Sequence, residues 1–208
     1  IDKHLVEVMN KYSNICNHIH LPLQAGSDRI LSRMNRTYTK QEFLDLVKMI
    51  RSIIPDCALS TDIIVGFPGE TESEFRETLE VVEKSSFNTA FTFKYSSRPG
   101  TKASEYSDQI SEKIKQERLQ ELINFQRDIT LKENQKYIGK TIDVLIEKNS
   151  KRSENKWSGR TQGNIGVIFD KDESSVKDIV QVKITSAHGV TMFGDIVSSL
   201  ERKKNEAA

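Results

Sequence analysis

The sequence contains few cysteines, no long apolar run and almost no net charge. Its only cysteines, Cys16 and Cys57, form neither a CxxC nor a CxxxCxxC pattern. They therefore indicate neither a disulfide framework nor a metal site, and we interpret them as buried, reduced thiols. No apolar run approaches the roughly 20 residues that cross a bilayer, and residues 1–12 resemble an amphipathic helix rather than a signal peptide. We expect a cytoplasmic protein with no membrane partner.

The charge is nearly balanced but unevenly distributed. The chain has 31 basic and 30 acidic residues, so its total charge neither requires nor excludes a nucleic-acid partner. Between Lys148 and Arg160, however, five basic residues face a single acidic one, Glu154. Trp157, the only tryptophan, lies within this stretch.

The first half of the chain alternates between strand-like and helix-like segments. Apolar runs at 17–23, 58–67 and 89–95 predict strands. Capping boxes at Thr39–Glu42 and Thr71–Glu74 predict the starts of two of the helices between them. This order is typical of βαβ units with a parallel sheet, so the fold class is α/β.

The pattern changes after residue 109. Residues 110–137 predict a connecting helix, and five short alternating runs with Gly, Asn and Asp between them then predict a small closed β-barrel. We therefore expect one domain at 1–109, a second at 138–201 and a charged tail at 202–208.

Two of the predicted strands end in residues suited to ligand contact. The stretch STDIIVGFPGETESEF places Gly66 and Gly69 between a strand and a capped helix, where bare backbone can approach a ligand. The stretch LPLQAGS places Gln24 and Ser27 at a neighbouring strand end. A plain turn at the glycines and an ordinary helix cap by Ser27 remain the alternatives.

Asp62 is a carboxylate within an apolar strand, and it must therefore be paired or hydrogen-bonded. It either holds a ligand hydroxyl or pairs with His18 or His20, which are two residues apart and so face the same side of their strand. With no third ligand evident, a hydrogen-bonded polar pair of histidines is favoured over a metal site.

Four blocks together resemble the radical SAM methylthiotransferases, most closely the MiaB-type tRNA branch. Three are HIHLPLQAGSDRILSRMNRTYT, STDIIVGFPGETESEF and FTFKYSSRPGTKA, and the fourth, GRTQGN followed by VIF, resembles the TRAM domain. Arg98 favours the tRNA branch, because the ribosomal-protein branch usually has an acidic residue there. Family members usually have Ser at the position of Ala25.

The resemblance implies a partial parallel (βα) barrel, half of a radical SAM barrel, followed by an OB-like TRAM barrel. S-adenosyl-L-methionine would bind across the carboxyl ends of the strands. The family match implies a cofactor site built from Gln24, Ser27, Asp62, Val65, Gly66 and Phe67.

The family also uses [4Fe-4S] clusters held by cysteines, and neither Cys16 nor Cys57 matches a ligand position. The chain thus looks like a C-terminal fragment that should not catalyse alone. We expect the strand near 17–23 to have an unpaired edge, which favours self-association.

The implied substrate is tRNA, bound at its anticodon stem-loop. Basic side chains attract phosphates and an aromatic ring can stack on a base. The alternative is a solvated loop with Trp157 in the barrel core. The expected RNA contacts are Lys151, Arg152, Lys156, Trp157, Arg160, Thr161 and Asn164.

Overall fold

The computed structural model describes residues 1–199, so the predicted tail at 202–208 and the last two positions of the expected second domain lie outside the described residues. The chain divides into two compact units between Thr130 and Leu131, within the long helix α6 (Glu112–Gln135). No helix in residues 1–199 is both long and apolar enough to cross a membrane.

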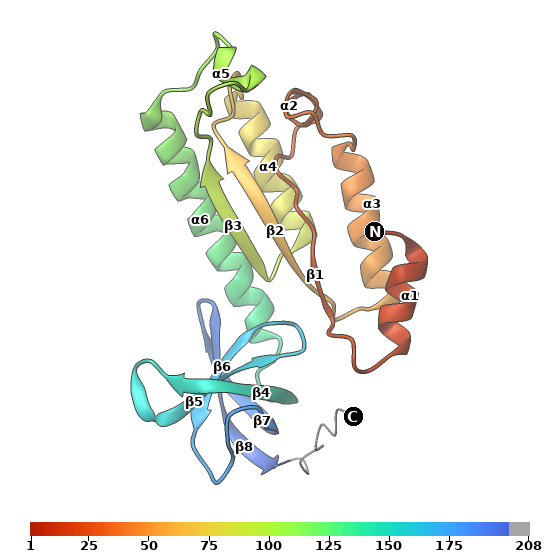
Figure 1. Cartoon of the computed structure of the whole chain (residues 1–208), viewed down its shortest axis with the longest axis vertical. Helices are drawn as coiled ribbons and strands as arrows, with labels where there is room; N and C mark the ends of the chain where they lie inside the picture. The colour runs from red at the N-terminus through yellow and green to blue at the C-terminus, as the bar shows by residue number, and fades with distance from the viewer. Residues whose placement is uncertain (200–208) are drawn as a thin grey trace. The chain divides into compact units, whose positions relative to one another are not determined.

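The first unit is built on a three-stranded parallel sheet (Figure 1). Its order is β1 (His18–His20), β2 (Ala58–Val65) and β3 (Thr89–Lys94), and each strand lies within a segment predicted as a strand. Besides most of α6, the helices of this unit are α1 (Lys3–Lys11), α2 (Asp28–Arg33), α3 (Lys40–Ile53), α4 (Glu72–Ser85) and α5 (Lys102–Glu105).

The predicted capping boxes fix where the two main helices begin. Thr39 and Glu42 exchange side-chain and backbone hydrogen bonds at the start of α3, and Thr71 and Glu74 do the same at the start of α4. Each box satisfies backbone N–H groups that have no partner within the helix. The first turn of α4, directly after β2, is therefore held in place.

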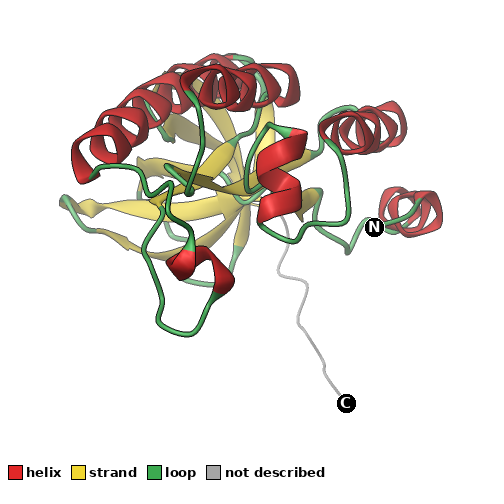
Figure 2. Ribbon diagram, turned by 90° about the horizontal axis from the view of Figure 1, so that it is seen from above, coloured by secondary structure: helices red, strands yellow, loops and turns green. Residues whose placement is uncertain are grey.

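One face of the sheet is covered by helices and the other is open. Ile63 and Val65 are fully buried with Phe75 of α4, and Figures 1 and 2 show the helices on this side. Phe91 and Phe93 alternate with the core-facing residues of β3, and each is 52% exposed. The open face therefore carries aromatic surface beside the carboxyl ends of the strands.

The second unit is a closed five-stranded barrel, which confirms the predicted OB-like fold. The strand order around the barrel is β4-β5-β6-β8-β7, with β6 and β8 parallel and the other pairs antiparallel. Its core includes Val144, Phe169, Val182 and Met192. The strands are β4 (Thr141–Ser150), β5 (Ser153–Thr161), β6 (Gly166–Asp170), β7 (Ile179–His188) and β8 (Thr191–Ser199).

Candidate functional site

The two strand ends singled out in the sequence lie side by side. Strand β1 ends at His20, earlier than the predicted Leu23, but the chain returns to the sheet at Gln24. The Gln24 N–H donates to the Asp62 carbonyl at 2.8 Å, and the Ile64 N–H donates to the Gln24 carbonyl at 2.9 Å. Gln24 has φ +65°, so its backbone bends sharply here.

The glycines after β2 are required by packing as well as by backbone conformation. Gly66 has φ +71° and Gly69 has φ +75°, a region that favours glycine. A Cβ on Gly66 would collide with the Lys115 side chain of α6, and one on Gly69 would collide with the Asp108 carboxylate. The space left by each missing side chain is thus filled by the protein itself, whereas the sequence suggested an approach for a ligand.

A buried ion pair holds the Gly66 turn. Glu70 and Arg118 are 2% and 7% exposed, and Glu70 Oε2 accepts from the Gly66 N–H at 2.7 Å and from Arg118 Nη1 at 2.8 Å. Arg118 Nη1 also donates to the Glu70 carbonyl at 2.9 Å. Burial raises the pKa of Glu70, although Gly66 and Arg118 act in the opposite direction.

Neither member of this pair was recognised as functional from the sequence. The two residues are 48 positions apart, and nothing in either local pattern connects them. The available signal was a glutamate placed directly before the capping residue Thr71, with a glycine four residues earlier.

Ser27 is tied to the start of α4 and does not cap α2 with its side chain. It occupies the N-cap position of α2, but its hydroxyl donates to Glu74 Oε1 at 3.1 Å. Arg29 Nε donates to the same oxygen at 2.6 Å. The hydrogen bond from Arg29, followed by those from Thr71 and Ser27, lowers the pKa of Glu74 to about 2 against the effect of burial. Glu74 thus links the two strand-end segments.

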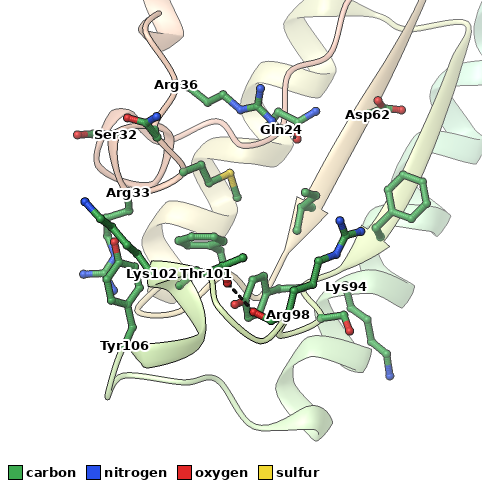
Figure 3. A pocket seen from close by; sticks show the side chains of 18 residues that line it. Gln24, Ser32, Arg33, Arg36, Asp62, Lys94, Arg98, Thr101, Lys102 and Tyr106 are labelled. Carbon is green, nitrogen blue, oxygen red and sulfur yellow. Dashed lines mark hydrogen bonds between the residues drawn. The ribbon is translucent and has the colours of Figure 1, made fainter.

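A cavity of about 960 Å³ opens at these strand ends (Figure 3). Of the predicted cofactor residues, Gln24, Asp62 and Phe67 line it. Ser27, Val65 and Gly66 do not, because Ser27 and Val65 are buried behind the wall and Gly66 packs on α6. Three of the six residues predicted to bind the cofactor thus line the cavity, and the other three lie outside its lining.

Aromatic side chains form much of the cavity wall. The Phe67 ring meets the Tyr95 ring edge-on, with centroids 5.1 Å apart. The Tyr106 ring also meets Phe67 edge-on, with centroids 6.4 Å apart. The exposed ring of Phe93 also lines the cavity, and the buried Tyr95 hydroxyl has no hydrogen-bond partner within residues 1–199. A flat, partly polar ligand would suit such a wall.

The histidines of β1 share one serine. His18 Nε2 and His20 Nδ1 lie 2.9 and 3.0 Å from Ser60 Oγ, as expected for side chains on the same face. His20 Nε2 also lies 3.3 Å from Asp62 Oδ2. Asp62 is thus hydrogen-bonded and one-third exposed towards the cavity, where a ligand can reach it.

The prediction for the cysteines is half wrong. Cys57 is buried, and desolvation raises the pKa of its thiol to about 11. Cys16 is exposed, because it lies in the loop between α1 and β1. Within residues 1–199, no three His, Cys, Asp or Glu side chains form a group that could hold a metal.

The basic stretch of the second unit, residues 148–160, lies within the β4–β5 hairpin. Lys151 and Arg152 are exposed at its turn, while Lys156 on β5 pairs with Asp170 at 3.0 Å. The Trp157 ring packs against the barrel core, and Lys171 Nζ lies 4.4 Å from its centroid. This contact agrees with the alternative of Trp157 as a core residue.

The remaining predicted RNA contacts meet at the β5–β6 turn. Arg160 Nη1 donates to the Asn164 carbonyl at 2.9 Å and to Asn164 Oδ1 at 3.0 Å, and Arg160 Nε lies 3.4 Å from Glu147. Thr161 Oγ1 accepts from the Ile165 N–H at 3.2 Å. These residues stabilise the turn and present a guanidinium at its surface.

Both units resemble known protein families. Residues 1–82 match the Radical SAM superfamily, and residues 135–197 match the TRAM domain. A solved structure of coproporphyrinogen III oxidase (HemN) from Escherichia coli, described as a radical SAM enzyme, shares the fold. It has a TM-score of 0.53 at 15% identity, with 78% of this chain and 44% of that chain covered.

Curated relatives of this chain include proteins named tRNA-2-methylthio-N(6)-dimethylallyladenosine synthase. That from Thermoanaerobacter sp. (strain X514) is 47% identical over 95% of this chain, and that from Porphyromonas gingivalis (strain W83) is 46% identical over 96%. The chain spans 42% and 43% of their lengths. The chain thus resembles a segment of the Radical SAM superfamily followed by a TRAM domain, in the arrangement that its sequence motifs implied.

Proposed function

We propose that this chain is part of a tRNA methylthiotransferase. The whole enzyme would add a methylthio group to C2 of N6-isopentenyladenosine at tRNA position 37, using S-adenosyl-L-methionine and iron–sulfur clusters. The observation that carries the proposal is the 47% identity to a synthase of that name over 95% of the chain. Because tRNA is modified in the cytoplasm, the enzyme would act there.

S-adenosylmethionine fits the cavity at the strand ends of the first unit. The aromatic wall around Phe67 suits an adenine ring, and the unpartnered Tyr95 hydroxyl offers a hydrogen bond. Gln24 and Asp62 would bind the polar groups of the ligand, while Ser27, Val65 and Gly66 hold the walls. When bound, the cofactor supplies the transferred methyl group and the radical chemistry of its superfamily.

The iron–sulfur clusters do not fit the residues of this chain. Such clusters are held by sets of cysteine thiolates, and here one cysteine is exposed and the other is buried with a raised pKa. We therefore expect this chain alone to be inactive. Reconstitution with iron and sulfide that gave a cluster able to cleave S-adenosylmethionine would contradict this expectation.

The barrel would hold the anticodon stem-loop. Lys151 and Arg152 project from the β4–β5 turn without an ion pair to any residue in the described part of the chain, so they are available to phosphates. Replacing Lys151, Arg152 and Lys156 by Gln should weaken binding of a fluorescent anticodon stem-loop RNA and flatten its salt dependence. Unchanged binding would remove the barrel from the RNA interface.

Two other functions are separable by the same binding assay. A ribosomal-protein methylthiotransferase would bind a ribosomal-protein peptide and not the stem-loop. A pure RNA-binding module, for which the complete barrel is the supporting observation, would bind the stem-loop and not S-adenosylmethionine.

Self-association through the β1 edge is also part of the proposal. Strand β1 pairs only with β2 among the described residues, so its other edge offers unpaired backbone groups. Light scattering that found only monomers would count against it.

A further inference from the structure

We propose that the cavity of the first unit carries a second RNA contact, a cationic rim made of Arg36, Arg98 and Lys102 that binds backbone phosphates. The inference rests on the proposed function and extends it, because the RNA contacts expected from the sequence all lie in the barrel. It follows from the charge balance of the cavity and from the segments that supply the charges.

The cavity lining is strongly positive. Arg33, Arg36, Lys94, Arg98 and Lys102 line it together with a single carboxylate, Asp62. Two of these cations are neutralised by residues outside the lining, because Arg33 pairs with Asp108 at 2.8 Å and Lys94 pairs with Glu112 at 3.0 Å. Figure 3 shows Lys94 pointing away from the other labelled side chains.

The other three cations have no compensating carboxylate. Arg36 Nη2 donates to Gln24 Oε1 at 3.2 Å, a neutral amide. Arg98 and Lys102 form no ion pair with any residue from 1 to 199, and Asp62 is already hydrogen-bonded to His20. Uncompensated cations beside a concave surface raise the local potential and attract anions.

The proposed cofactor does not satisfy this charge. S-adenosylmethionine carries a sulfonium and an ammonium group against a single carboxylate, so it brings no net negative charge that could neutralise the rim. A polyanion that enters the same opening would neutralise both the rim and the cofactor. An RNA strand has that chemistry, since each nucleotide adds one phosphate charge.

The rim also has the layout of a single-strand binding surface. Arg36 comes from the connection between α2 and α3, while Arg98 and Lys102 come from the loop and helix after β3. The exposed Phe93 ring lines the same cavity. Basic groups that follow the backbone beside an aromatic ring that stacks a base are the usual combination for single-stranded nucleic acid. The geometry suits a splayed loop nucleotide.

The test is a salt titration of RNA binding by the triple variant R36Q/R98Q/K102Q. All three residues are exposed, so the fold should be retained. With about 0.7 units of slope per phosphate contact in a single strand, the slope of log K against log salt should fall by about 2. Between 50 and 200 mM salt, the unmodified chain should thus lose about 20-fold more affinity than the variant.

The matched control is K48Q/K113Q/R127Q, which removes the same charge from exposed residues of α3 and α6 outside the cavity lining. It should keep a slope close to that of the unmodified chain, and so should R98K, which retains the charge. An equal fall in slope for both triple variants would reduce the effect to net charge and overturn the inference.

The barrel variant K151Q/R152Q/K156Q separates this inference from the proposed function. If that variant lowers the slope and R36Q/R98Q/K102Q does not, the cationic rim is refuted and the RNA-binding barrel stands. If the unmodified chain does not bind the stem-loop at all, both fail. If both variants lower the slope and the control does not, two separate contacts are established.

Discussion

The buried pair of Arg118 and Glu70 gives the sharpest prediction about stability. Replacing Arg118 by Met keeps most of the side-chain volume and removes the charge, which leaves the Glu70 carboxylate buried without a cation. Removing one partner of a buried pair costs about 3–5 kcal/mol. Since whole domains are stable by only about 5–15 kcal/mol, the first unit should be severely weakened.

The loss of stability in R118M should depend on pH. Arg118 lowers the pKa of Glu70 while burial raises it, so the raised pKa rises further in R118M. A carboxyl whose folded pKa lies above its unfolded value weakens the fold as pH rises through that interval. The cost of R118M should therefore be largest at pH 7.5 and shrink towards pH 5, where the proton neutralises Glu70.

Urea unfolding followed by circular dichroism at 222 nm measures this, because most of the helix lies in the first unit. Trp157 belongs to the second unit, so its fluorescence follows the barrel separately. If the free energy of unfolding falls by about 2 kcal/mol per molar urea, the midpoint of the helical unfolding transition should fall by about 2 M urea.

The matched control is R127M, which changes an exposed arginine on the same helix and should stay within about 0.5 kcal/mol of the unmodified chain. Adding E70Q to R118M removes the unpaired buried charge of Glu70 and should recover part of the lost free energy of unfolding. A cost for R118M below about 1 kcal/mol, equal at both pH values, would refute the reasoning.

Two further predictions concern Gly66 and Glu74. Gly66→Ala should destabilise the first unit by more than about 1 kcal/mol in urea unfolding, because a residue with a Cβ is strained at φ +71° and the Cβ would collide with Lys115. A stability equal to that of the parent would show that the turn relaxes freely. Glu74 has a pKa lowered to about 2, so its contribution to the stability of the fold is present above the ordinary value near 4.5 and is lost as pH falls towards 2. E74Q should therefore be less stable than the parent at pH 7 and should lose less of its stability on acidification. Parallel curves of stability against pH for E74Q and the parent would contradict this.

The sequence predicted what depends on local patterns. Strand β2, the caps at Thr39 and Thr71, and the five barrel strands all follow from periodicity and capping chemistry, and each was found. The strand ends of the cavity were located because parallel strands place their carboxyl ends at one edge.

The features that the sequence missed depend on contacts across the fold. Ser27 reaches Glu74, 47 residues away, and Arg118 reaches Glu70, 48 residues away. The same limit applies to the cationic rim, where Arg36 and Arg98 come from separate segments, and to the exposure of Cys16, which depends on where its loop lies.

Because the two thiols are unequally buried, their reaction rates can be used to measure how often the first unit unfolds transiently. A thiol-specific reagent acts on the thiolate, so Cys16 should be modified at once in the native protein. Cys57, 3% exposed and with its pKa raised to about 11, can react only when the start of β2 separates from the helices. The delay between the first and second added mass would time the transient unfolding of the sheet without any introduced probe.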